Sequence, residues 1–356
     1  MERVVRLRHK FSTFSGPAGY TRAHSRAGSN KRVVFIIIVL VLLIAAASVL
    51  YIYSRTYAKA FRLGVPMTPQ AFDSIMGRTL PHLYGMGAAA IVLAVVSLSF
   101  QTITQSRVLT PSMIGFDSVF VGTQTVLVFF FGAQHFLFSD PLINYLITAG
   151  IMVVVSMLMF GAILRNHRNN IVFLLMFGLV LSGIIGSATS YLQIIMNESD
   201  FFQVAAATSV NVNNMNTDII NLVIPIMAVV VALTLFRHRK YNVMTLGPQQ
   251  AKGLGVAYER ELKWNLVLIA VGMSVATALI GSLTFLGLLA VNAAREVMKT
   301  YKHLPLFIGS ALMAALTLIL GQGVTELLEG AIPVTAIVNL VGCSYIFFLI
   351  LKENKV

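Results

Sequence analysis

Few side chains in this 356-residue sequence are arranged for enzyme chemistry. A phosphate-binding loop of the form G-x-x-x-x-G-K-[ST] does not occur, and neither does the zinc motif H-E-x-x-H. The seven histidines lie in polar segments or at the ends of apolar runs, so none is placed to activate a serine within such a run: 9, 24, 82, 135, 167, 238 and 303. We therefore expect no enzyme activity, no metal site and no cofactor.

Two further side-chain types bear on chemistry within the apolar runs. Asp117 is the one acid near the interior of a run, whereas an ion-coupled transporter typically carries several ionisable groups at mid-membrane depth. We expect nearby backbone or neighbouring helices to satisfy this carboxylate, and the energy for transport to come from another chain. The single cysteine, Cys343, excludes a disulfide framework and is expected to pack within its apolar run.

Small residues recur at helical spacing in the run 171–195. Ser182, Gly186 and Ser190 stand at i, i+4 and i+8, so they share one face of a helix. Such a face lets two helix backbones approach closely. The alternative is that it lines a mildly polar central path across the membrane, and the sequence leaves both interpretations open.

The connection 237–263, RHRKYNVMTLGPQQAKGLGVAYERELK, carries the most informative pattern. Pro248 suits the first turn of a helix because its missing N–H costs nothing there. Gly253 and Gly255 are expected to supply the positive φ that ends the helix. The pattern predicts a short, rigid helix flanked by basic residues, and we interpret it as a docking segment rather than a solvated linker.

The elements that position these residues follow from composition. The chain is 57% hydrophobic and 11% charged, with a mean hydropathy of +0.82, which excludes a soluble globular fold. Its apolar runs approach the ~20 residues that cross a bilayer as a helix. The sequence predicts an all-α membrane protein with a basic tail, 1–32, and one domain, 33–352. Its ten expected spans are 33–53, 80–103, 111–131, 142–164, 171–195, 217–236, 262–281, 284–298, 306–328 and 333–351. The eighth span is short, and Gly287 and Asn292 suggest that it is broken or tilted. The connection 196–216 is expected to hold a partial helix at the outer face.

The net charge of +13 reports orientation rather than nucleic-acid binding. Twenty-two of the 26 Lys and Arg residues fall in the tail or in connections on one side, which predicts that both termini are cytoplasmic. The other four are Arg55, Lys59, Arg62 and Arg78, in the first outward connection.

Four stretches resemble the permease subunits of the iron-siderophore and cobalamin ABC importers. LGPQQAKGLGV resembles the family's cytoplasmic coupling segment, L-G-E-x-x-A-x-x-L-G-V. SFQTITQSRVLTPSMIGFDS, SLTFLGLLAVNAAREVMKTYKHLPLFIGSALMA and AIPVTAIVNLVGCSYIFFLILKE resemble three further family motifs, in the family's order, across about residues 72–352. In its detail, SFQTITQSRVLTPSMIGFDS looks closer to the branch that handles ferric siderophores of the petrobactin and catecholate kind.

The resemblance implies which residues have which roles. Gly247, Pro248, Ala251, Gly253, Leu254 and Gly255 would contact the ATPase. Relatives carry outward arginines that meet acids on a binding protein. Here Arg78 and His82 stand near the first such site, with Arg62 before them, whereas the second site offers Glu326 and Glu329. The family's Pro-His in span eight is Val291-Asn292 here, and its Asn-Pro after span two is Arg107-Val108.

The predicted function is therefore the permease of an ATP-driven ferric-siderophore importer in the cytoplasmic membrane. Its expected partners are cytoplasmic ATP-binding subunits, a second permease chain of the same or another kind, an extracytoplasmic siderophore-binding protein and the lipid membrane, but no nucleic acid. Two alternatives stay open. The same machinery could carry haem or cobalamin, or the chain could be an ion-coupled secondary transporter.

Overall fold

The computed structural model describes residues 22–58, 68–166, 171–210 and 215–353, and within these ranges it contains helices and no strand. The predicted all-α class is confirmed. The elements are α1 (Arg22–Tyr53), η2 (Ser54–Ala58), α3 (Pro69–Thr104), η3 (Ser112–Ile114), α4 (Phe116–Phe131), α5 (Phe136–Ser139), α6 (Pro141–Asn166), α7 (Ile171–Ile195), α8 (Glu198–Thr208), α9 (Thr217–Phe236), α10 (His238–Met244), α11 (Pro248–Gly253), α12 (Tyr258–Ile280), α13 (Leu286–Met298), α14 (His303–Leu327) and α15 (Val334–Glu353).

Each of the ten predicted spans overlaps one of these helices. Seven helices in the described residues are long and apolar enough to cross a membrane: α1, α3, α6, α7, α9, α12 and α14. Helix α4 and the first part of α15 are shorter apolar helices, and α13 belongs to neither group. The helices of the predicted spans are therefore present, while the count of ten crossings stays a prediction.

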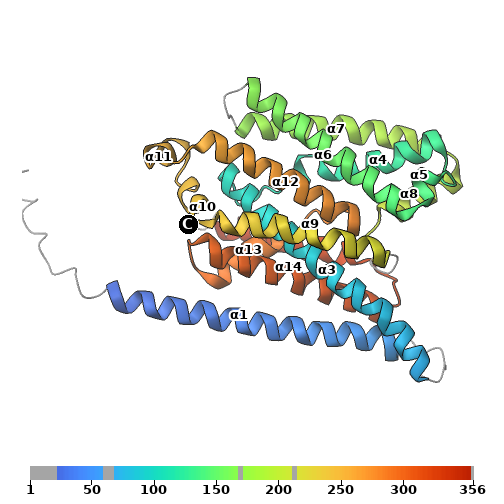
Figure 1. Cartoon of the computed structure of the whole chain (residues 1–356), viewed down its shortest axis with the longest axis horizontal. Coiled ribbons are helices and arrows are strands. Elements are labelled where there is room, and N and C mark those ends of the chain that lie inside the picture. The colour runs from blue at the N-terminus through green and yellow to red at the C-terminus, as the bar shows by residue number, and fades with distance from the viewer. Residues whose placement is uncertain (1–21, 59–67, 167–170, 211–214, 354–356) are drawn as a thin grey trace, which may run out of the picture.

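Helix α3 forms the centre of the bundle. It packs against α9, α12, α13 and α14, and 72% of its apolar window is buried. Figure 1 shows α1 along one side of the molecule and the pair α6 and α7 along the other, with α3 crossing between them. Helices α1 and α7 are each only 11% buried, so their apolar side chains remain free to meet lipid or another subunit.

Two short helices start within the bundle rather than at its surface. At 1.5 Å per residue, α4 and α13 extend about 24 Å and about 20 Å, less than the ~30 Å of a hydrocarbon core. Irregular segments precede both, at 105–115 and 281–285, and the second of them reaches the first turn of α4, where Thr284 Oγ1 donates a hydrogen bond to Asp117 Oδ2 at 2.6 Å. Residues 110–112 and Gly281 are buried, and enclosure by protein is the condition under which non-helical backbone at membrane depth is tolerated.

Three expectations need correction. Helix α1 begins at Arg22, so it extends eleven residues into the predicted basic tail, 1–32, ahead of the predicted first span, whereas residues 1–21 lie outside the described ranges. The predicted break in the eighth span at Gly287 and Asn292 is wrong, because α13 is continuous through both and the irregular backbone lies before it. Cys343 is exposed on α15 rather than packed. The predicted helix in 196–216 is confirmed as α8.

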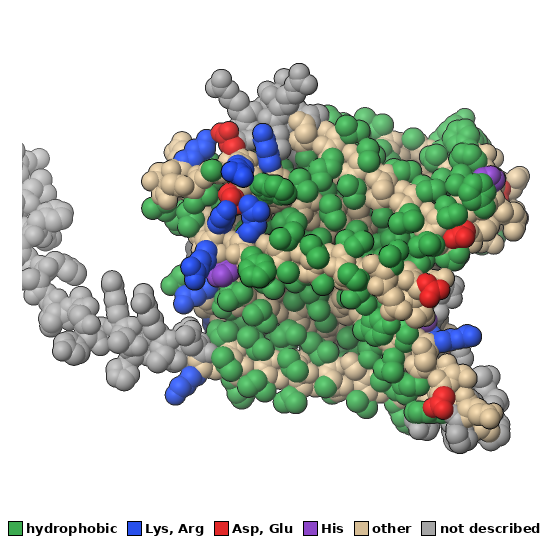
Figure 2. All heavy atoms as spheres, in the orientation of Figure 1, with side chains coloured by type: hydrophobic (Ala, Val, Ile, Leu, Met, Phe, Trp, Pro, Cys, Tyr) green, Lys and Arg blue, Asp and Glu red, His purple; other side chains and the backbone are tan. Residues whose placement is uncertain are grey.

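Charge is distributed unevenly along the bundle. Figure 2 shows Lys and Arg side chains gathered at the end that carries α10 and α11, together with a smaller number of acids. Helix α1 begins at that end, and the described part of the chain also ends there (Figure 1). The described chain therefore starts and finishes at the basic end of the molecule, the geometry that the Lys and Arg counts predict for two termini on one side.

Candidate functional site

The segment Gly247–Gly255 forms a capped helical turn that protrudes from the basic end. Gly247 precedes α11 with φ 97°, and Pro248 occupies the first turn as predicted. Gly255 follows α11 with φ 81°, a left-handed conformation that suits glycine. The expectation that Gly253 also has a positive φ is wrong, because the helix continues through Gly253 and only Gly255 reverses the chain.

Gly247 is needed for a second, steric reason. A Cβ at this position would lie 3.1 Å from Gln250 Oε1 and 3.2 Å from Gln105 Nε2. Gln105 belongs to the connection between α3 and α4, so the start of α11 is in close contact with that connection. A larger residue at position 247 would crowd the ends of these two glutamine side chains, which would have to shift by a few tenths of an ångström.

The other predicted residues of this segment divide into an anchor and an exposed surface. Ala251 is fully buried, and its carbonyl accepts a hydrogen bond from Val256 N at 3.0 Å. Leu254 is 63% exposed, an apolar side chain at the tip of a polar loop. An ion pair between Lys252 Nζ and Glu259 Oε1 at 2.9 Å is exposed on both sides and contributes little to stability. Leu254 is therefore the side chain best placed to enter a pocket on another protein.

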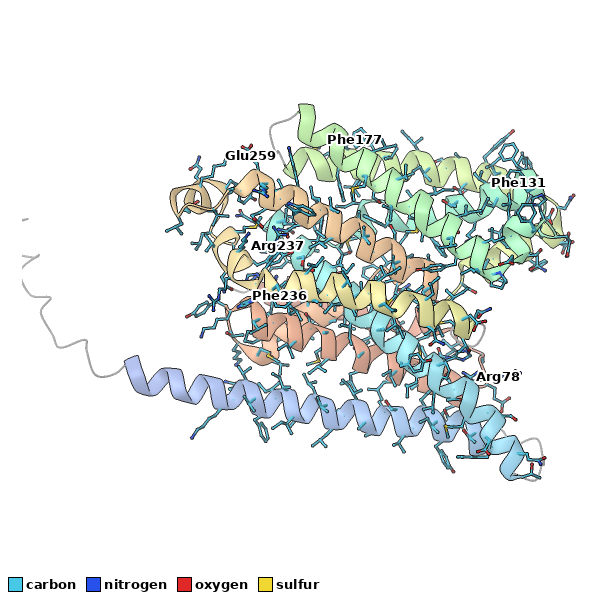
Figure 3. The ribbon with its side chains drawn as sticks, in the orientation of Figure 1. Arg78, Phe131, Phe177, Phe236, Arg237 and Glu259 are labelled. Atoms are coloured by element: carbon cyan, nitrogen blue, oxygen red, sulfur yellow. The ribbon has the colours of Figure 1, made fainter. Side chains whose placement is uncertain are left out.

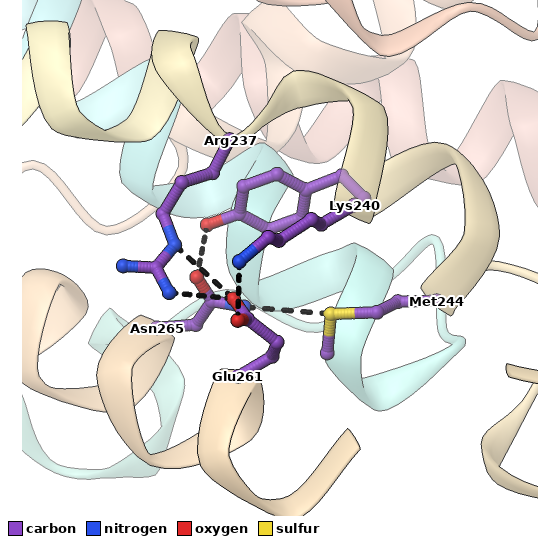
Figure 4. A network of polar contacts seen from close by, with 6 residues as sticks. Arg237, Lys240, Met244, Glu261 and Asn265 are labelled. Carbon is purple, nitrogen blue, oxygen red and sulfur yellow. Dashed lines mark hydrogen bonds and ion pairs between the residues drawn. The ribbon is translucent and has the colours of Figure 1, made fainter. Parts of the chain in front are cut away.

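A network of charged and polar contacts fixes α10 to α12 beneath this segment (Figure 4). Glu261 Oε2 accepts from Arg237 Nη2 at 2.6 Å and from Nε at 3.1 Å, and Glu261 Oε1 accepts from Lys240 Nζ at 2.5 Å. The Glu261 side chain is only 7% exposed, so two cations compensate a carboxylate that is largely removed from water. Removing either cation would leave this charge partly unpaired.

The same network continues through neutral groups. Tyr241 OH donates to Asn265 Oδ1 at 2.8 Å, and Asn265 Nδ2 lies 3.6 Å from Met244 Sδ. Burial raises the pKa of the Tyr241 phenol, so it remains protonated and serves as a donor. We did not predict this network from the sequence. The spacing could have indicated it. Arg237, Lys240 and Tyr241 stand at i, i+3 and i+4, and the acid Glu261 and the amide Asn265 stand at i and i+4 of a second helix.

The small-residue face of α7 is partly packed and partly free. Ser182 is half-buried against α4, and its Oγ lies 2.7 Å from Ser118 Oγ. Gly186 has open space where a Cβ would stand, and Ser190 is exposed. Ser182 therefore takes part in helix packing, whereas the lining of a central path by Gly186 and Ser190 stays a prediction.

Two of the predicted docking residues, Arg78 and His82, lie at the end opposite α11, but they are not equivalent. Arg78 is exposed near the start of α3, far from Arg237 and Glu259 along the bundle (Figure 3). His82, one turn further, is 4% exposed and its Nε2 lies 3.0 Å from the Met215 carbonyl oxygen, so it cannot face a protein partner in this conformation. Arg62 lies outside the described residues. Arg55 donates to Tyr51 OH at 2.6 Å and is held on its own helix.

The same end of the molecule contains a cavity of about 440 Å³. Polar residues from α4, α6 and α8 line it, among them Gln124, Asn144 and Gln203, together with aromatic rings such as Phe120 and Phe138. Ser182, Gly186 and Ser190 are not among its lining residues. Among the residues that the structure describes, no three His, Cys, Asp or Glu side chains gather as a metal-binding group.

Comparison with known proteins places these features in a family. Residues 33–352 match the model of the FecCD transport family. The petrobactin import system permease protein YclO of Bacillus subtilis is 35% identical over 283 residues, which cover 78% of this chain and 90% of the relative. The petrobactin import system permease protein FatC of Bacillus anthracis is 32% identical over 244 residues, 68% of this chain and 69% of the relative.

A solved structure has the same fold. A metal-chelate type ABC transporter in an inward-facing conformation superimposes with a TM-score of 0.74 at 21% sequence identity, covering 89% of this chain and 99% of that one. The family match extends over nearly the whole helical part of the chain, from α1 to α15. This chain therefore belongs to the FecCD transport family.

Proposed function

We propose that this chain, a permease subunit of an ABC importer and not an enzyme, carries ferric siderophores of the petrobactin or catecholate kind across the cytoplasmic membrane. The observation that carries the substrate is its identity of 35% and 32% to two permeases named for petrobactin import. The glycine-capped segment 247–255 supports the mechanism, because it presents a defined, protruding surface at the basic end of a bundle of apolar helices.

ATP hydrolysis takes place on separate cytoplasmic subunits. These contact Leu254 and the exposed side of α11, and their closure displaces the segment 247–255. The displacement converts a cavity open to the outside into one open to the cytoplasm. A binding protein delivers the chelate at the opposite end, where Arg78 is exposed.

A second permease chain, identical or related, completes the path. Helix α7 supports this assignment because its surface away from α4 is apolar and largely uncovered, with Ile184 62% exposed and Ile194 81% exposed. Gly186 and Ser190 lie on the same helix and would line the path where the two chains meet. The arrangement leaves α1, on the other side of the bundle, in contact with lipid.

Iron uptake in a deletion strain tests the substrate. Radioactive iron presented as petrobactin, a catecholate chelate, a hydroxamate chelate or haem, with labelled cobalamin as a separate arm, should enter the complemented strain only with the first two. Uptake should survive an uncoupler of the proton gradient when ATP is held constant. Uptake that stops with the uncoupler would instead support an ion-coupled carrier, and import of haem or cobalamin alone would replace the proposed substrate.

A matched pair of glycines tests the coupling role. Gly255→Ala places a Cβ on a residue with φ 81° and should strain the turn by about 1–2 kcal/mol, whereas Gly253→Ala adds a Cβ into open space on a helical residue. We expect Gly255→Ala to lower uptake and transport-linked ATP hydrolysis several-fold in the reconstituted importer, with Gly253→Ala close to wild type. Equal activity of both variants and the wild type would remove the segment from the coupling mechanism.

A further inference from the structure

Helix α10 connects the protruding segment to the core of the bundle. Helix α11 packs mainly on α10 and α12, whereas α10 contacts α3, α9 and α14 as well as α11. A displacement of α11 relative to the core therefore passes through α10, through α12 or through the contact with the connection at Gln105. Helix α10 is joined to α12 by the charged and polar network around Glu261. Its contacts with α14 are aromatic packing and hydrogen bonds between neutral groups.

The contact of α10 with α14 is made by aromatic rings. Tyr241 stacks on the ring of His303 with 5.9 Å between ring centres and 21° between planes. It also meets Phe307 edge-on at 5.3 Å. Tyr241, His303 and Phe307 are all nearly or fully buried, so this packing resists separation of α10 from α14.

A chain of hydrogen bonds runs through the same point. Asn242 Oδ1 lies 2.8 Å from the backbone N of His303 and 2.9 Å from its Nδ1. Because a backbone N–H can only donate, Oδ1 is the acceptor for both, and Nδ1 carries the proton. The remaining nitrogen of the neutral ring, Nε2, is then an acceptor, and it lies 3.0 Å from Thr102 Oγ1.

Thr102 completes the chain on α3. Thr102 is only 4% exposed. Its Oγ1 also lies 2.8 Å from the Leu98 carbonyl oxygen, so the single hydroxyl proton is shared between that carbonyl and His303 Nε2. Three elements, α10, α14 and α3, are thus joined through a single imidazole with a fixed tautomer. Both ring nitrogens are used, which fixes the ring orientation as well as its position.

We propose that Asn242, His303 and Thr102 are positioning residues for transport, which pass the displacement of the segment 247–255 to α14 and α3. The inference rests on the proposed function. The Glu261 ion pairs hold α10 to α12, and the Asn242, His303 and Thr102 chain holds it to the opposite helices, so α10 moves with all three. Without the chain, the same displacement tilts α10 locally and leaves α14 and α3 behind.

Three substitutions on α3 provide a matched test. Thr102→Val removes the hydroxyl at nearly constant volume, whereas Thr102→Ser keeps the hydroxyl. Thr104→Val is the control, because Thr104 Oγ1 bonds only to carbonyls of its own helix, Phe100 O at 2.9 Å and Gln101 O at 3.5 Å. Asn242→Leu breaks the chain at its other end. Each variant is assembled with the ATP-binding subunits and the binding protein in lipid nanodiscs or vesicles.

The readout is the number of ATP molecules hydrolysed per chelate imported, beside basal ATP hydrolysis and thermal stability. We expect Thr102→Val and Asn242→Leu to raise this ratio about fivefold, the factor equivalent to about 1 kcal/mol, a typical net contribution of one hydrogen bond. Basal hydrolysis should not change, Thr102→Ser should restore the ratio, and Thr104→Val should match the wild type.

The outcomes separate this inference from the proposed function. If the wild-type complex imports no ferric siderophore, the proposed function fails. If it imports the chelate and both disrupting variants keep the wild-type ratio, the positioning role is overturned while the proposed function stands. The positioning role is also overturned if Thr102→Val loses thermal stability and Thr102→Ser does not restore the wild-type ratio of ATP hydrolysed to chelate imported. A general packing defect would then explain the poorer coupling.

Discussion

Asp117 lies at the start of α4, where this helix meets the irregular segment 281–285. Its Oδ2 accepts from Thr284 Oγ1, and its Oδ1 is buried without a hydrogen-bond partner in the described part of the chain. It also stands in the first turn of α4, where the positive end of the helix dipole favours a negative group. The position therefore combines a cross-link between α4 and the segment 281–285 with a local electrostatic role.

Two substitutions at Asp117 distinguish these roles. Asp117→Asn keeps an oxygen that can accept from Thr284, whereas Asp117→Leu leaves a buried hydroxyl without its acceptor at a cost of about 1–3 kcal/mol. We expect the leucine variant to melt at a lower temperature in detergent and to transport less, and the asparagine variant to stay close to wild type. Thr284→Val should reproduce the leucine variant. An asparagine variant as impaired as the leucine variant would show that the charge itself is required.

Single residues also show where sequence reasoning ends. Both Gly253 and Gly255 are compatible with the end of a helix, so spacing alone could not indicate that only Gly255 has a positive φ. The family resemblance places His82 with Arg78 near a binding-protein site, yet one turn of helix moves it from the surface into contact with Met215. The sequence defines the neighbourhood of a residue, whereas the packing of a distant segment decides its exposure.

At the scale of elements, close packing of α13 on α3 depends on a glycine. A Cβ on Gly287 would lie 2.0 Å from Ser97 Oγ and 2.8 Å from Ser97 Cβ, and 3.3 Å from the Leu93 carbonyl oxygen. The two helices therefore approach each other through a surface that has no space for a methyl group. This close approach is the physical reason for a glycine at position 287 of α13. The sequence analysis took the same glycine as a sign that the span is broken or tilted.

Gly287→Ala should therefore separate α13 from α3 or strain Ser97. We expect a loss of about 1–3 kcal/mol in stability, the usual cost of overpacking, measured as a lower melting temperature and lower yield of purified protein. The control is Gly87→Ala on α3, where nothing lies within 4 Å of the new Cβ. The double variant Gly287→Ala with Ser97→Gly should recover part of the loss. A Gly287→Ala protein as stable as the control would contradict the close approach.

Most elements could be predicted because a membrane-crossing helix needs a long apolar run, which is visible without any tertiary contact. The start of α1 could not, because Arg22 to Arg32 is polar and its helical conformation leaves no trace in hydropathy. The network around Glu261 was missed for a related reason. Its members come from two helices, and a single sequence does not show which faces meet.

For the whole molecule, the first question is orientation. If the basic end is cytoplasmic, a cysteine at Gln249 should react only with reagents that cross the membrane, and a cysteine at Asn197 should react with impermeant reagents. Both native side chains are exposed, so access is limited by the membrane rather than by burial. Exposed Cys343 must first be replaced by serine. Labelling of position 249 by an impermeant reagent in intact cells would invert the orientation and contradict the assignment of 247–255 to the ATPase side.

The second question is how the outer end meets its delivery protein. Among the described residues at that end, we infer that the exposed Arg78 contacts the binding protein. Arg62, which lies outside the described residues, is a second basic residue in the same outward connection of the sequence. Attraction between exposed charges acts over a Debye length of about 8–10 Å and weakens with salt. Arg78→Glu and Arg62→Glu should therefore slow association with the binding protein most at low salt, reduce uptake at low chelate concentration and leave basal ATP hydrolysis unchanged. Arg78→Lys keeps the charge and should behave as wild type. Association rates that are identical for all variants across a range of salt would assign both arginines to contacts with lipid headgroups, since that role needs no partner protein.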